Sequence, residues 1–176
     1  NPNYCLASMG NYIFDREVLL DALERDQKIE ESSHDFGKNV IPMLLKEGKE
    51  IFVYNFAENT HEGMSEAEKG YWMDVGSIDA YWQANMDLLE YEPELNLYSK
   101  DWPLRTFNYN YPPAKFIWQE GDRVGMATNS MVSEGSRVYG DVDYSILFND
   151  VTVEEGAEVK YSIVMPGTVI KKGAVV

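Results

Sequence analysis

Three polar side chains in the first half of the chain have surroundings that suit ligand binding. Ser8 lies close to Gly10, and a glycine leaves room for a ligand to approach the backbone. Asp74 follows an apolar segment, residues 71–73, where we expect a strand to end, and α/β folds place ligand-binding groups at strand ends. Asp35 lies where a helix is expected to begin. Each has a plainer alternative, namely a serine bonded to backbone, a turn residue and a helix cap.

The elements that must position these side chains follow from hydrophobic periodicity. We expect strands at residues 4–14, 51–56 and 71–76. We expect helices that begin after Asp15, near Asp35 and after Ser77. Pro42 lies inside the second helix and predicts a bend or an early break there. Alternating strands and helices predict an α/β layer in this part of the chain.

The C-terminal part of the sequence repeats. Residues 129–132, 144–147 and 161–164 share a polar pair followed by two apolar residues, and turn residues lie between the copies. A regular repeat of this kind, built from imperfect six-residue units, is typical of a parallel β-helix. A meander of hairpins is the alternative, but hairpins do not require similar side chains at regular offsets.

Composition excludes several classes of function. Lys and Arg number 15 against 30 Asp and Glu, so the net charge of −15 would repel a nucleic acid. The sequence has no apolar run long enough to span a membrane and no secretory signal pattern. Cys5 is the single cysteine, so no internal disulfide can form, and a reducing, cytoplasmic location is expected.

Four stretches of the sequence together resemble bacterial glucose-1-phosphate adenylyltransferases, also called ADP-glucose pyrophosphorylases. They read ASMGNY (7–12), HDFGK (34–38), YWMDVG (71–76) and WPLRT with PPAKF (102–106 and 112–116). The resemblance implies part of a Rossmann-like nucleotidyltransferase domain at 1–92, a linker at 93–119 and a left-handed parallel β-helix of hexapeptide-like repeats at 120–176. It also implies synthesis of ADP-glucose and pyrophosphate from ATP and glucose 1-phosphate with Mg²⁺, for glycogen biosynthesis, in an allosteric homotetramer.

The resemblance also assigns roles to individual residues. It implies that five side chains contact glucose 1-phosphate, namely Ser8, Tyr12, Asp35, Phe36 and Trp72. It implies that Asp74 is a ligand of Mg²⁺. The three aromatic residues have a core position as their alternative. Asn11 departs from the family, which usually has an aliphatic residue there, and we expect it to alter packing only.

Two family elements are not found in this sequence, the N-terminal Gly-rich nucleotide loop and the Glu-Lys-Pro element that supplies a lysine for the sugar phosphate. We therefore expect a segment of a longer enzyme that is inactive alone and holds no catalytic residue. We also expect it to self-associate through the open edge of its β-helix.

Other functions stay open at this stage. Another sugar-1-phosphate nucleotidyltransferase, with a different sugar or base, fits the same motifs. A non-catalytic regulatory subunit of the same family also fits. A hexapeptide-repeat acyltransferase would share the β-helix, but His34 and His61 both lie outside the repeats where such enzymes carry a catalytic histidine.

Overall fold

The computed structural model describes residues 7–118 and 125–176 of the chain, which forms two compact units, Asn1–Tyr54 and Asn55–Val176. Cys5 and the expected boundary between linker and β-helix lie outside the described residues. The division at 92 and 119 stays a prediction. No helix in the described ranges has the length and apolar character needed to cross a lipid bilayer.

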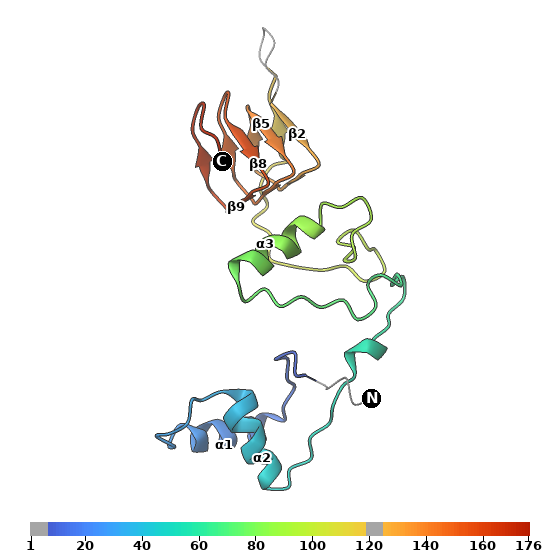
Figure 1. Cartoon of the computed structure of the whole chain (residues 1–176), viewed down its shortest axis with the longest axis vertical. Helices are drawn as coiled ribbons and strands as arrows, with labels where there is room; N and C mark the ends of the chain where they lie inside the picture. The colour runs from blue at the N-terminus through green and yellow to red at the C-terminus, as the bar shows by residue number, and fades with distance from the viewer. Residues whose placement is uncertain (1–6, 119–124) are drawn as a thin grey trace. The chain divides into compact units, whose positions relative to one another are not determined.

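The first unit is built around a pair of helical segments (Figure 1). Helix α1 (Arg16–Asp26) begins as predicted, because the Asp15 carboxylate accepts the backbone N–H groups of Glu17 and Val18 at 3.0 and 3.2 Å. A π-helical turn, η1 (Phe36–Val40), continues into α2 (Ile41–Lys46). The helix predicted near Asp35 is thus divided into a π-helical turn and α2, and Pro42 falls in the first turn of α2, where a missing N–H costs no hydrogen bond. The buried residues of this unit's core are Ala22, Val40 and Leu44.

The second unit contains a 3₁₀ turn, η2 (Phe56–Glu58), and helix α3 (Ile78–Asp87). Ser77 caps α3 as predicted, since its hydroxyl accepts the Ala80 N–H at 3.2 Å. The Trp82 indole N–H donates to the Tyr161 carbonyl at 2.8 Å, which joins α3 to the C-terminal repeats.

The prediction of strands at residues 4–14, 51–56 and 71–76 is wrong for the described residues of these segments. Residues 7–14, 51–55 and 71–76 have no strand assignment and belong to none of the β-sheets of the described chain (Figure 1). Many of their apolar side chains stay exposed, as Phe52 at 87% shows, although Phe14 packs on the core of the first unit. The physical reason is that a strand exists only through hydrogen bonds to a partner, which periodicity alone does not supply.

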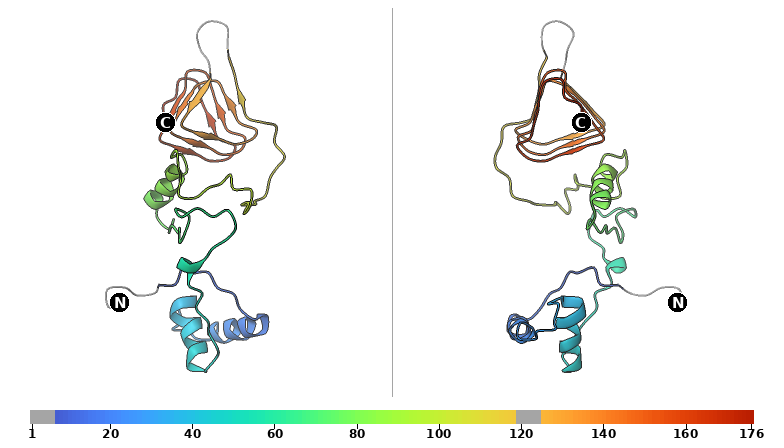
Figure 2. Two further views of the ribbon diagram at one scale, coloured as in Figure 1. Left: turned by 90° about the vertical axis from the view of Figure 1, so that its right-hand side faces the viewer. Right: turned by 60° about the vertical axis from the view of Figure 1, so that its left-hand side comes forward.

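The C-terminal repeats form three parallel sheets in the described residues, the arrangement typical of a left-handed β-helix. The first sheet has the order β1 (Lys115–Phe116), β4 (Arg137–Val138), β7 (Thr152–Val153) and β10 (Val169–Ile170). The second has β2 (Met126–Thr128), β5 (Asp141–Asp143) and β8 (Glu158–Lys160). The third has β3 (Met131–Val132), β6 (Ile146–Leu147) and β9 (Ile163–Val164). Figure 2 shows the stacked coils as a triangle.

The register of these sheets confirms the repeats seen in the sequence. Met131 pairs with Ile146, which pairs in turn with Ile163, so the apolar pairs of the three copies stack on one another. Inward side chains of successive coils thus bury one continuous core. Its buried members are Val138, Val142, Leu147, Val151, Val153, Ala157, Val159, Val164 and Ile170.

The serine of each repeat links neighbouring coils at one corner. The Ser145 N–H donates to the Ser130 hydroxyl at 3.0 Å, and the Ser162 N–H donates to the Ser145 hydroxyl at 3.1 Å. Each serine follows a residue of left-handed backbone conformation, with φ of 45° at Asn129, 44° at Tyr144 and 47° at Tyr161. The polar pair of the repeat therefore turns the corner and satisfies the backbone of the next coil.

We predict that Ser145→Ala lowers the free energy of unfolding by about 1–3 kcal/mol, because the Ser162 N–H loses its acceptor and a buried hydroxyl is removed. Ser145 is fully buried, and its hydroxyl also donates to the Asp143 carbonyl at 2.8 Å. Ser162→Ala is the matched control and should cost less, since Ser162 is only half-buried and its hydroxyl donates to the Lys160 carbonyl. Urea denaturation followed by circular dichroism measures both. Equal losses would contradict a special role for the buried serine.

Candidate functional site

A shallow hollow of about 370 Å³ in the first unit brings together the predicted site residues of that unit. Its lining residues are Ser8, Gly10, Tyr12, His34, Asp35, Phe36 and Gly37. Four of these, Ser8, Tyr12, Asp35 and Phe36, are the residues that the sequence resemblance assigns to glucose 1-phosphate. The structure thus places them side by side, and their roles in binding stay predictions.

One side of the hollow is a pair of hydroxyl groups. The Ser8 and Tyr12 hydroxyls are hydrogen-bonded to each other at 2.7 Å, and the Gly10 N–H donates to the Ser8 hydroxyl at 3.2 Å. Gly10 has a φ of 78°, a conformation that glycine adopts without steric cost, and it turns the chain so that Ser8 and Tyr12 meet. Both hydroxyls are exposed, so a ligand can exchange hydrogen bonds with them.

Aromatic rings form the apolar part of the hollow. The Tyr12 and Phe36 rings are stacked, with centroids 5.7 Å apart and an interplanar angle of 27°. Phe14 supports both rings from the same cluster, at 6.2 Å from Tyr12 and 5.7 Å from Phe36. Phe36 is half-buried, so it takes part in packing and also reaches the hollow. Such a ring suits the C–H face of a sugar.

The Asp35 carboxylate lies at the start of η1. Its Oδ1 accepts the Lys38 N–H at 2.7 Å, which makes it the N-cap, and its own N–H donates to Asn39 Oδ1 at 3.1 Å. A Cβ atom on Gly37 would lie 3.4 Å from Asp35 Oδ1 and 3.9 Å from the Tyr12 hydroxyl. Glycine at this position therefore keeps the space beside the carboxylate open.

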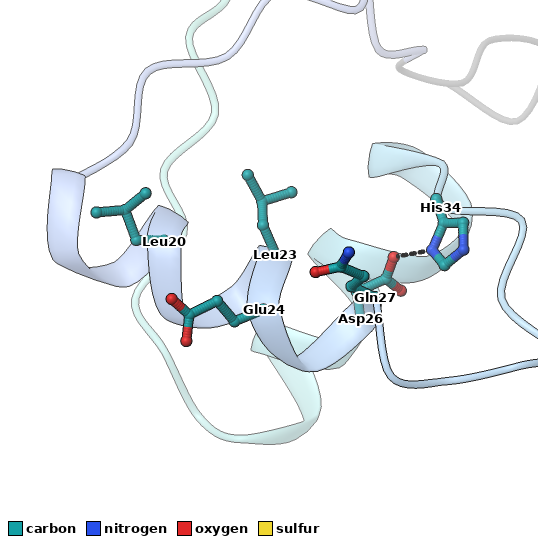
Figure 3. Close-up of a pocket in the computed structure, with 6 residues that line it drawn as sticks. All are labelled: Leu20, Leu23, Glu24, Asp26, Gln27 and His34. Carbon is teal, nitrogen blue, oxygen red and sulfur yellow. Dashed lines mark hydrogen bonds and ion pairs between the residues drawn. The ribbon is translucent and has the colours of Figure 1, made fainter.

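Sequence reasoning missed the contribution of Asp26. Asp26 is the last residue of α1 and only 3% exposed. The Ser32 hydroxyl donates to Asp26 Oδ1 at 2.7 Å, and His34 Nδ1 lies 2.7 Å from Asp26 Oδ2 (Figure 3). These two hydrogen bonds lower the pKa of the Asp26 carboxyl below its ordinary value, and the bond from Ser32 has the larger effect. No motif in the sequence indicates this contact.

The two remaining predicted residues, Trp72 and Asp74, belong to the second unit. Trp72 is 44% exposed, so it is not a core residue. Asp74 is exposed, and its Oδ1 accepts the Gly76 N–H at 3.0 Å, which closes a turn just before the Ser77 cap of α3. The plainer alternative for Asp74, a turn residue, is therefore present, and a second role is compatible with it.

The surroundings of Asp74 bear on its implied role as a ligand of Mg²⁺. No group of three or more His, Cys, Asp or Glu side chains in the described residues is arranged to hold a metal. Mg²⁺ does not need such a group, because it commonly takes one or two carboxylates and completes its shell with water and substrate phosphate. An exposed single carboxylate such as Asp74 fits that pattern.

Comparison with known proteins is consistent with this arrangement. Residues 2–91 match the family "Nucleotidyl transferase", and residues 112–176 match "GlmU-like, C-terminal hexapeptide". The chain is 48% identical to a glucose-1-phosphate adenylyltransferase of Anaeromyxobacter dehalogenans over 90% of its length, and 46% identical to one of Corynebacterium jeikeium over 100%. A third, of Corynebacterium glutamicum, is 47% identical over 99% of the chain.

These relatives are longer proteins. The chain spans 39% of the Anaeromyxobacter relative and 42% of each Corynebacterium relative. The nucleotidyl transferase match covers the hollow and the Asp74 turn, and the hexapeptide match covers the β-helix. The chain therefore belongs to the nucleotidyl transferase family and is a homologue of glucose-1-phosphate adenylyltransferases.

Proposed function

We propose that this chain forms the sugar-binding part of an enzyme that transfers an adenylyl group from ATP to glucose 1-phosphate. The products are ADP-glucose, a precursor for glycogen synthesis in the cytoplasm, and pyrophosphate. The observation that carries the proposal is the hollow, in which Ser8, Tyr12, Asp35 and Phe36 lie together. The three relatives with the same printed name support the choice of reaction.

The chemistry of the hollow suits the glucose ring better than the phosphate. None of the described residues that line it is Lys or Arg, so it offers no permanent cation to a phosphate group. Its hydroxyls and the Asp35 carboxylate can instead exchange hydrogen bonds with sugar hydroxyls. The stacked rings of Tyr12 and Phe36 offer an apolar surface to the other face of the sugar. The part of the reaction that this unit performs is therefore to bind and orient the sugar.

The reaction needs positioning more than proton transfer. A phosphate oxygen of glucose 1-phosphate forms a bond to the α-phosphorus of ATP, and the bond from that phosphorus to the bridging oxygen of pyrophosphate breaks. Because a sugar phosphate is already an anion near neutral pH, it needs no general base to attack. When bound, Mg²⁺ supplies charge neutralisation between these anionic groups, and Asp74 would be one of its ligands.

The test is an assay of pyrophosphate release by the full-length gene product that contains residues 1–176. Release from ATP and glucose 1-phosphate that stops when a chelator removes Mg²⁺ is expected. Release only with UTP or dTTP would move the function to a sibling sugar-1-phosphate nucleotidyltransferase. No release with any nucleotide would favour a regulatory subunit. As the family resemblance implies, we also expect a homotetramer, which light scattering on the same sample measures.

We predict that Ser8→Ala and Tyr12→Phe each raise the KM for glucose 1-phosphate by about tenfold, because each removes a hydroxyl from the exposed pair, and leave kcat nearly unchanged. Steady-state kinetics with varied sugar phosphate measures both constants. Tyr98→Phe is the control, since Tyr98 is 78% exposed and does not line the hollow. An unchanged KM in both variants would exclude the hydroxyl pair from sugar binding.

A further inference from the structure

A buried carboxylate outside the predicted site is bonded to the loop that carries the sugar-binding residues. Asp26 at the end of α1 uses both of its oxygens, Oδ1 for the Ser32 hydroxyl and Oδ2 for His34 Nδ1. The His34 N–H donates in turn to the Ser32 hydroxyl at 3.1 Å. This donor is the His34 backbone N–H, so the three residues form a closed network. Figure 3 shows the Asp26 and His34 side chains pointing toward each other.

The backbone at His34 has a conformation that needs such support. Its φ is 56°, in the left-handed region, where a residue other than glycine is held at a cost of roughly 1–3 kcal/mol. The next residue, Asp35, returns to an extended conformation with φ of −92°. The reversal at His34 therefore sets the direction in which Asp35 and Phe36 enter the hollow.

His34 is also the residue that separates two hollows. It lines the sugar-binding hollow together with Asp35, and it lines a second one of about 320 Å³ together with Glu24 and Asp26 of α1. Carboxylates therefore line both hollows that the ring borders, Glu24 and Asp26 in one and Asp35 in the other. The contact of Nδ1 with the Asp26 carboxylate places the proton of a neutral ring on Nδ1 and fixes the ring orientation.

We propose that the Asp26–Ser32–His34 network is a positioning device for glucose 1-phosphate, with His34 as the positioning residue that orients Asp35 and Phe36. The inference rests on the proposed function, since it assigns to this network the alignment of the proposed sugar pocket. Asp26 and Ser32 do not line the hollow and act on the sugar through the loop, and His34 borders the hollow beside Asp35. Loosening it weakens sugar binding and leaves nucleotide binding unaffected, because the hollow carries no nucleotide contact in the proposed reaction.

The test uses three variants of the full-length gene product and one control. Asp26→Asn removes the charge, Ser32→Ala removes one hydrogen bond, and His34→Gly removes the ring while a glycine keeps the left-handed backbone accessible. Asp26→Asn and His34→Gly are expected to raise the KM for glucose 1-phosphate by about tenfold, with kcat and the KM for ATP within about twofold. Ser32→Ala should raise the KM for glucose 1-phosphate by about threefold. Glu24→Gln, in the second hollow, should change nothing.

Each outcome decides for or against the inference. A selective rise in the KM for the sugar phosphate supports it, and Ser32→Ala decides if Asp26→Asn does not fold. Unchanged constants in the variants overturn it, as does a His34→Gly enzyme that matches the wild type. A fall in kcat together with a rise in the KM for both substrates shows a general structural role and also overturns the inference. Loss of folding in every variant does the same. Inactivity of the wild type with every sugar 1-phosphate overturns the proposed function instead, so the two failures differ.

Discussion

Asp74→Asn should reduce kcat for pyrophosphate release from ATP and glucose 1-phosphate by ~1000-fold or more in the full-length gene product. Asparagine has the same shape, and its side-chain oxygen can still accept the Gly76 N–H that closes the turn at 3.0 Å. The substitution therefore removes the negative charge and keeps the local fold. A lower apparent affinity for Mg²⁺, measured by titrating the metal against rate, should accompany the loss.

The matched control for this variant is Asp79→Asn. Asp79 lies in the first turn of α3, where an acidic residue stabilises the helix through its dipole, so its loss should cost only about 0.3–1 kcal/mol and little activity. Full activity of Asp74→Asn would leave Asp74 as a turn residue only. A large loss in both variants would indicate damage to α3 and not loss of a metal ligand.

The β-helix is the part of the fold that the sequence predicts best. Its coils repeat the same short pattern, and stacking places equivalent residues next to each other, as Met131, Ile146 and Ile163 show. Pairing partners therefore lie one repeat away, and the repeat itself indicates the register. The helices were also predictable, because Asp15 and Ser77 cap them through bonds to residues two or three positions on.

The strands predicted in the first half could not be judged from the sequence in the same way. A segment such as residues 51–56 has the apolar composition of a strand, but its pairing depends on another segment far along a chain. Nothing local identifies that segment. No β-sheet of the described residues includes it, and Phe52 remains exposed.

The candidate site was predictable in its residues and not in its support. Ser8, Tyr12, Asp35 and Phe36 are named by the family resemblance, and the structure places them in one hollow. The network behind them depends on Asp26, eight residues before His34 and on the far side of a loop. An aspartate at that distance from a histidine has no distinctive pattern, and only the folded loop makes it a partner.

A large loss of stability is expected at a corner of the β-helix. Gly140→Ala should lower the free energy of unfolding by about 3 kcal/mol or more, because the added Cβ would lie 2.3 Å from the Ala157 carbonyl oxygen and 2.8 Å from that of Glu154. Both are backbone atoms and cannot move aside as a flexible side chain would. The Ala157 oxygen also accepts the Asp141 N–H at 2.9 Å, so moving this oxygen away from the methyl group would weaken a hydrogen bond between coils.

The sequence alone would not single out Gly140, because Ala157 occupies the equivalent place in the next coil. The register shows the difference, since Arg137 pairs with Thr152 but Asp141 pairs with Glu158, so the later coil has a longer corner than the earlier one. Gly140 lies in the short corner, directly against the longer one. Gly167→Ala is the control: no atom lies within 4 Å of its Cβ position, and only its φ of 71° should cost about 1–2 kcal/mol. Thermal and urea unfolding of the two variants compares them, and an equal loss would show that the corner relaxes around the methyl group.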